Sequence, residues 1–341
     1  MKFTLTQSHR AALVAALVAT LLAPSVMADE VVPEALRAAA LKKRKDGHKG
    51  KLTVGATGSA NSSSNVVGAA DGTSVQIGIL VQGSSKLTSG QHTIETEGRL
   101  QHAQTRTPVL PVFVKSTDVL EGQSTWMYSL ASIPWIGPFA RLKLSTQAFS
   151  SEDVRPGDVT VEREAVDGTK TTEQVTAETP TPTTSFFEPL ILNQTAGMFA
   201  NPISRKKLTL KAKLGAGAQQ IIARDGYAVA SFDDKTKTVK LRQLETSLQA
   251  GGEFELQAEG AISDNTSWTA KANFFQPLYS NATRKLSGLD ALQTDVSAAL
   301  SVKLSSWAKL DYVLNVRRIP LVLEEWQVQH GLMLTTGFNL L

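Results

Sequence analysis

The sequence contains no cysteine, which excludes disulfide bonds, thiol nucleophiles and cysteine-ligated metal sites. Long hydrophobic runs are also missing, apart from one between Ala11 and Leu22. That run is about a dozen residues long, whereas a helix that spans a bilayer needs roughly 20. If the chain crosses a membrane, it must do so with strands, because a closed barrel also satisfies every backbone group in lipid.

Charged residues are fewer than usual, and neither sign dominates. They make up 19% of the chain, with a formal net charge of +4, against roughly 25% charged residues in average domains. A nucleic-acid-binding protein gathers its Lys and Arg residues on one face, and the sequence shows no such clustering. We therefore expect no nucleic-acid partner.

Signatures of catalysis are missing as well. The sequence has no HExxH motif, no GxSxG nucleophile elbow and no phosphate-binding loop. The glycines of Gly215-Ala216-Gly217-Ala218 continue an alternating strand pattern, which explains them better than a nucleotide fingerprint does. We predict that the protein is not an enzyme, that no residue is catalytic and that it holds no cofactor.

The histidines do not suggest a metal site. His92 and His102 fall on the same face of one predicted strand but at its opposite ends, too far apart to share an ion. His330 falls among apolar neighbours. Structural or interfacial roles are the more common ones for such residues, so we expect no bound metal.

The N-terminus has the features of a secretory signal peptide over residues 1–28. Lys2 and Arg10 precede the apolar run, and Val26-Met27-Ala28 forms a small-residue cleavage site, so we expect cleavage after Ala28. The alternative is a transmembrane anchor, for which the run is short. No cysteine follows the cleavage site, which excludes a lipid-modified N-terminus.

Residues 29–49 are expected to form a short periplasmic leader. Helix-forming residues follow Pro33, and Lys42-Lys43-Arg44-Lys45 supplies cations that suit a helix C-terminus. The leader is either a solvated, partly ordered tail or a segment that contacts anionic cell-wall or lipid groups.

From Lys51 onward apolar and polar residues alternate with a period of two, which is the period of a β-strand. The pattern predicts strands over residues 51–64, 73–85, 91–104, 117–132, 137–150, 187–199, 207–222, 243–260, 264–278, 294–316 and 325–340. A bacterial barrel has an even number of strands. We therefore expect a twelfth strand, within residues 151–205 or 223–245.

The predicted strands are long, and each has one apolar phase and one charged or polar phase. Strands in soluble sandwiches usually have about five or six residues, whereas a tilted membrane strand needs about 9–11. In a membrane barrel the apolar phase faces the lipid and the polar phase faces the interior, which accounts for both phases. We therefore predict an all-β fold, an antiparallel transmembrane β-barrel of about 12 strands (range roughly 10–14), spanning residues 50–341.

Aromatic residues in the outward phase are expected to form a girdle at the membrane interfaces. The alternative is the ordinary aromatic core of a soluble β protein. The residues concerned are Trp126, Tyr128, Trp268, Phe274, Tyr312, Trp326 and Phe338.

Residues 151–186 differ from the strands in composition. They are rich in Glu, Asp, Thr and Pro, and their apolar residues are sparse. The pattern from Val159 to Val175 around Asp167-Gly168 is that of a small polar hairpin. We predict a long polar surface loop, with an inward-folded plug as the alternative.

Charges in the inward phase are expected to form a network in the lumen. Opposite charges on neighbouring strands stabilise strand pairing, and a polar interior needs partners for its charges. The network either braces the barrel or forms a charge-segregated pore that orients a solute. Arg99, Glu95, Glu97 and Glu121 could extend it. The core set is Lys207, Lys211, Lys213, Glu253, Glu255, Glu259, Arg141 and Lys143.

Several short motifs resemble a domain-of-unknown-function family of bacterial outer-membrane barrels related to the salt-induced outer membrane protein type. The motifs are Asp118–Tyr128, Trp135–Arg141 with Thr146-Gln147, Phe187–Leu190 leading to Gly197, and Trp307–Tyr312 followed by Pro320. The resemblance covers roughly residues 50–341 and implies an outer-membrane barrel without catalytic residues. Such chains commonly end in an aromatic residue, whereas this one ends Phe338-Asn339-Leu340-Leu341.

These observations favour a passive pore or transport barrel for small solutes in the outer membrane. The alternatives are a structural or surface-interaction barrel with a closed lumen, a soluble periplasmic β protein and, least favoured, a membrane-embedded hydrolase. The expected partners are outer-membrane lipid and lipopolysaccharide, the barrel assembly machinery and a small solute.

Overall fold

The computed structural model describes residues 46–63, 72–205, 207–305 and 308–339. The predicted signal peptide, its cleavage site after Ala28 and residues 29–45 of the predicted leader lie outside these ranges. The described residues include no helix that is long and apolar enough to cross a membrane.

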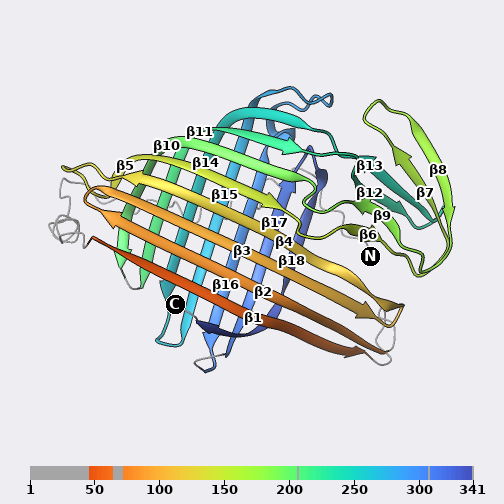
Figure 1. The fold of residues 1–341 in the computed structure, drawn as a ribbon, viewed down its shortest axis with the longest axis horizontal. Helices are drawn as coiled ribbons and strands as arrows, with labels where there is room; N and C mark the ends of the chain where they lie inside the picture. Colours follow the sequence, from red (N-terminus) through yellow and green to blue (C-terminus); the bar gives the residue numbers. More distant parts are fainter. Residues whose placement is uncertain (1–45, 64–71, 206, 306–307, 340–341) are drawn as a thin grey trace, which may run out of the picture. The chain divides into compact units, whose positions relative to one another are not determined.

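Twelve antiparallel strands form a closed barrel (Figure 1). Strands β1 and β18 pair from Thr53 with Asn339 to Gly58 with Leu334, which joins the two edges of the sheet. The strands are β1 (Gly47–Ser63), β2 (Gly72–Ser89), β3 (His92–Thr107), β4 (Leu110–Tyr128), β5 (Ile136–Thr146), β10 (Leu190–Arg205), β11 (Leu208–Ile222), β14 (Ser247–Ala261), β15 (Thr266–Ser280), β16 (Gln293–Lys303), β17 (Ala308–Ile319) and β18 (Leu323–Asn339). The predicted all-β fold and the count of twelve are confirmed.

The position expected for the twelfth strand was wrong. It lies within 294–316, which the alternation presented as one long strand and which is in fact β16 and β17. The turn between them contains no Gly, Pro, Asn or Asp, and Leu304 and Leu310 stay in the same apolar phase across it. The pattern therefore passed through the turn without the break that usually marks one.

The barrel is apolar outside and polar inside. Leu214 in the middle of β11 is 64% exposed. Other large apolar side chains exposed on the strands are Ile77, Ile79, Leu142, Leu300, Val328 and Leu332. Buried polar side chains of the strands include Arg141, Thr195, Gln219, Glu253, Glu255, Gln293 and Asp311. This is the reverse of a soluble protein and the arrangement of a membrane-spanning barrel, so the alternative of a soluble periplasmic protein does not fit the fold.

The two ends of the barrel differ in the length of their connections. One end has short turns, such as those at 90–91 and 262–265. The other end, which we call the upper end, has short turns at 108–109 and 320–322 but also the long connections 147–189, 223–246 and 281–292. Bacterial outer-membrane barrels have short periplasmic turns and longer extracellular loops. The upper end has the longer connections, as the extracellular end of such barrels does.

Two of the long connections fold together into a four-stranded sheet, which we call the loop sheet (Figure 1). Its strands are β7 (Val159–Glu164) and β8 (Lys170–Val175) from the first connection, and β12 (Tyr227–Asp233) and β13 (Thr238–Gln243) from the second. The structure contains the hairpin around Asp167-Gly168 as β7 and β8. In addition β13 pairs with β7 in parallel, which the sequence did not suggest.

The loop sheet has an apolar core of its own. Val159, Val161, Val239 and Leu241 are buried together, and partly buried side chains pack around them. Each connection supplies half of the core, so the few apolar residues of the first connection suffice once the second is added. Near the two ends of the first connection, β6 (Ser151–Asp153) pairs with β9 (Thr181–Thr184) in a two-stranded antiparallel sheet.

Glu188 ties the two connections to each other. Glu188 precedes β10 in the sequence and is 2% exposed. Its carboxylate accepts hydrogen bonds from the backbone N–H groups of Arg224 (2.7 Å), Gly226 (2.9 Å) and Ser185 (3.1 Å). Burial alone would raise the pKa of Glu188, but these N–H groups and Arg224 outweigh it and hold the pKa below its ordinary value of 4.5.

Replacing an outward apolar residue with a cation tests the membrane-spanning geometry. Leu214→Arg at the middle of β11 is expected to destabilise the barrel in lipid vesicles by about 2–4 kcal/mol, the usual cost of Arg at the bilayer midplane. Urea unfolding in the vesicles measures this difference. The control is Leu289→Arg, because Leu289 is 78% exposed in a connection outside the strands. Equal effects of the two substitutions would contradict contact of Leu214 with lipid.

The Glu188 contacts make the loop sheet sensitive to acid. Because the folded-state pKa is lowered, the stabilisation by the ionised carboxylate is fully present above the ordinary value of 4.5 and is lost as the pH falls through the folded-state pKa. Limited pepsin digestion of folded protein should therefore cut residues 147–189 faster as the pH is lowered through this window. Glu188→Gln should be cut quickly throughout it, whereas Glu173→Gln, at an exposed position of β8, should behave like the wild type.

Candidate functional site

The barrel interior brings together residues from strands far apart in the sequence. Lys213 on β11 lies directly opposite Glu255 on β14, because the two strands pair in register. Arg141 on β5 reaches the same two carboxylates, Glu253 and Glu255, although β10 and β11 lie between β5 and β14. Lys271 on β15 completes the group.

We call these five residues the Arg141 cluster. The Arg141 guanidinium donates to Glu255 Oε2 through Nη1 (2.5 Å) and to Glu253 through Nη2. Glu255 also accepts from Lys213 Nζ at 2.9 Å and lies 3.2 Å from Lys271 Nζ. Three cations therefore face two carboxylates. Arg141, Glu253 and Glu255 are all buried, so each charge depends on its partners rather than on water.

Neutral side chains complete the hydrogen bonding of Glu253. Thr195 Oγ1 and Asn273 Nδ2 both donate to it, from the flanking strands β10 and β15. A buried charge is tolerated only when such additional bonds satisfy its remaining lone pairs. The cluster thus links β5, β10, β11, β14 and β15 across the interior.

Glycines on β11 leave space for the Arg141 side chain to extend over the inner face of the wall toward β14. The inward residues of β11 along its path are Gly215 and Gly217, which have no side chain. A Cβ on Gly217 would lie 3.2 Å from Thr195 Oγ1, a donor in the cluster. The two inward glycines of this strand therefore make room for the cluster.

The remaining predicted network residues lie at other heights. Lys211 is 3.5 Å from Glu259, and Lys143 on β5 is 3.9 Å from Asp295 on β16. The exception is Lys207, which lies exposed in the turn before β11 and takes no part in the interior. The alternation continued one residue beyond the strand, and it gives no signal for where a strand ends.

Most of the predicted girdle residues lie on the outer face, but near one end of the barrel. Trp126 and Tyr128 end β4, and Trp268 begins β15, all beside the short turns. Trp126, Tyr312 and Trp326 are exposed, and Trp326 lies toward the opposite end, near the start of β18. Phe274 stacks on Phe254. Phe338 is opposite Val54 in the β1–β18 register, and its side chain is outside the description.

Two cavities lie in the lumen, and charged residues line both. The upper cavity, of about 440 Å³, faces the Arg141 cluster and the upper halves of β16 and β17. The lower cavity, of about 410 Å³, is lined by residues of β1 to β5 and by Lys271 of β15. Four residues line both cavities, namely Arg99, Glu121, Lys143 and Lys271. No residue of 151–186 lines either cavity, so the structure gives no support to a plug formed by that segment.

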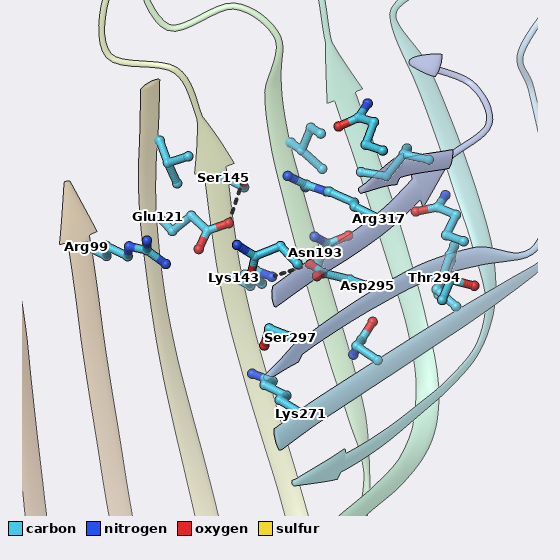
Figure 2. A pocket seen from close by; sticks show the side chains of 18 of the residues that line it. Arg99, Glu121, Lys143, Ser145, Asn193, Lys271, Thr294, Asp295, Ser297 and Arg317 are labelled. Carbon is cyan, nitrogen blue, oxygen red and sulfur yellow. Dashed lines mark hydrogen bonds and ion pairs between the residues drawn. The ribbon is translucent and has the colours of Figure 1, made fainter. Parts of the chain in front are cut away.

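The residues that line both cavities are three cations and one carboxylate (Figure 2). Glu121 accepts one hydrogen bond, from Ser145 Oγ at 3.4 Å, and lies in the field of Lys143, Arg317 and Arg99. Arg317 on β17 is directly opposite Asp295 on β16 in the strand register. Its Nε is nevertheless buried without a hydrogen-bond partner.

A cluster of amides lies at the upper end of the same wall. Gln219 and Gln293 exchange hydrogen bonds of 2.9 and 2.7 Å. Gln249 and Asn193 accept from this pair, and all three glutamines are buried. Sequence reasoning missed these residues and also Lys271, Asp295 and Arg317. From the sequence they were recognisable only as polar residues of predicted strands, because alternation gives no information on register.

Removing Arg141 should weaken the whole barrel. Arg141→Gln leaves two buried carboxylates without their shared cation, and breaking a buried ion pair costs about 3–5 kcal/mol. Urea unfolding in detergent micelles or lipid vesicles measures the loss. Lys143→Gln is the control, because its ion pair is long and partly exposed, and it should cost less than about 1 kcal/mol. Equal losses would show that the Arg141 cluster does not brace the wall.

The described residues contain no group of three or more His, Cys, Asp or Glu side chains that could hold a metal ion. No protein-family model matches the chain, and no curated protein matches its sequence.

Solved structures with low similarity include three bacterial outer-membrane proteins. One is an outer-membrane channel from Pseudomonas putida F1, with 11% identity, a TM-score of 0.39, and coverage of 91% of this chain and 100% of that one. Another is the translocator domain of the autotransporter NalP from Neisseria meningitidis (9%, 0.33, 89% and 92%). The third is the channel DcaP of Acinetobacter baumannii (9%, 0.26, 87% and 99%).

Proposed function

We propose that the protein is a passive pore of the bacterial outer membrane for small polar solutes. The observation that carries the proposal is the pair of lumen cavities with four lining residues in common. Because they share lining residues, the two cavities adjoin in the barrel interior, and we take them together as the polar path inside an apolar cylinder. Such a path is what a solute needs to cross a bilayer.

The path is narrow. Lys143 and Asp295 approach to 3.9 Å although β5 and β16 are not neighbours in the barrel. The Arg141 cluster fills another part of the interior. A barrel of twelve strands lies between small filled barrels and the wide porins, so we infer passage of small solutes only.

The location follows from the same features. The signal peptide of residues 1–28 would direct export, and assembly machinery would insert the strands into a membrane rich in lipopolysaccharide. The relationship to the salt-induced outer membrane protein type also belongs to this proposal and rests on the motifs quoted above. We infer no catalytic step.

The loop sheet supports a second candidate, a barrel that also binds a partner at the cell surface. β8 is an edge strand of this sheet and pairs only with β7. Five of its six residues are exposed. An edge with free backbone groups can add a strand from another protein.

Single-channel recordings in planar bilayers test the pore. Wild-type protein that shows heat-modifiable gel mobility should conduct, and Ser297→Trp, which places a large ring in the upper cavity, should lower the conductance by roughly half or more. Ala298→Trp is the matched control, because this neighbouring residue has the opposite phase and faces outward. Folded wild-type protein that never conducts would contradict the pore.

A further inference from the structure

We propose that the upper cavity holds the oxyanion of a small acidic solute, a carboxylate or a phosphate, with Arg317, Arg99 and Lys143 as its ligands. We call these three residues the Arg317 site. The inference names the solute class of the pore and thus rests on the proposed function. The argument begins with the carboxylates that are already neutralised.

The acids of the Arg141 cluster are fully occupied. Glu255 contacts Arg141, Lys213 and Lys271, and Glu253 contacts Arg141, Thr195 and Asn273. They therefore leave nothing to neutralise the cations elsewhere in the cavity. Glu121 and Asp295 are the acids that remain among the residues lining it.

Three cations surround those two acids. Lys143 is 3.9 Å from Asp295, near the limit of an ion pair, and the Arg99 Nη2 donates to the neutral amide of Gln101. Arg317 makes no ion pair with any residue that the structure describes, and its Nε is buried and unpartnered. Arg317 itself is only partly buried, but a buried N–H donor without an acceptor is costly, and a bound oxyanion would accept from it.

The chemistry of the site fits an oxyanion. The three cations come from β17, β3 and β5 and all line the upper cavity; in Figure 2 Glu121 lies between Arg99 on one side and Lys143 and Arg317 on the other. Guanidinium groups bind carboxylate and phosphate through two parallel hydrogen bonds. A cavity with low-dielectric walls also concentrates ions of the opposite sign.

The rest of the cavity suits the rest of a small polar molecule. Asn193, Ser297, Asn315 and Gln327 line it and offer neutral donors and acceptors. Its volume of about 440 Å³ is in the range of small-molecule sites. Glu121, among the cations, disfavours a large excess of bound anion, so one oxyanion is the expected load.

Binding is measured without transport, by isothermal titration of the folded barrel in detergent with sodium succinate, inorganic phosphate or neutral sucrose. Succinate, phosphate or both should bind, and sucrose should not. Arg317→Gln and Arg99→Gln should each weaken binding about tenfold, the effect of losing one charge-assisted hydrogen bond. Arg317→Lys should restore part of it. Heat-modifiable mobility shows that each variant is folded.

The matched control is Lys51→Gln. Lys51 lines the lower cavity and not the upper one, so it removes the same charge from the lumen at a distance from the Arg317 site. Its binding should stay close to that of the wild type. Absence of binding by both anions, or an equal loss in Lys51→Gln and Arg317→Gln, overturns the site.

Reversal potentials in a KCl gradient separate this inference from the pore. Wild-type protein should prefer chloride, and Arg317→Gln should lose that preference more than Lys51→Gln does. Binding of succinate or phosphate by a barrel that never conducts supports the site and refutes the pore. Conductance without binding and without anion preference supports the pore and refutes the site.

Discussion

The structure depends on one constraint, that lipid offers no hydrogen bonds to a polypeptide backbone. The strands meet it by closing on themselves, and the pairing of β1 with β18 removes the last free edge. Closure then decides where each side chain goes, since alternate residues face lipid and interior. The charges of the inward phase are therefore turned toward the lumen, where their partners come from other strands.

That confinement divides the interior charges into two groups. Arg141, Glu253 and Glu255 satisfy one another and hold the wall from β5 to β15, which is bracing. Arg317 and Arg99 have no carboxylate at ion-pair distance among the described residues, and our proposal is that they act on a solute. The sequence left bracing and charge segregation as alternatives. The contacts of the Arg141 cluster are those that bracing requires, and the Arg317 site is our proposal for a solute.

Alternation in the sequence predicts the phase of each strand and little else. It identified Lys213 and Glu255 as inward residues, and their pairing followed because β11 and β14 are neighbours. It missed the turn between β16 and β17, because the phase is unchanged across it. It also assigned Lys207 to a strand that begins one residue later, at Leu208. The reach of Arg141 over two strands depends on register and on glycines, and neither is visible in a period of two.

The loop sheet shows the same limit outside the membrane. The first connection alone has too few apolar residues for a core, so its composition indicated a loop, and only the parallel pairing of β13 with β7 brings the second half of the core to it. The two connections leave the barrel at β5 and β11 and return at β10 and β14. The hairpin β10–β11 lies between these points. Glu188, just before β10, accepts hydrogen bonds from backbone N–H groups of the second connection. Order in the loops therefore depends on the strand order of the barrel, because strand order is what brings the two connections together.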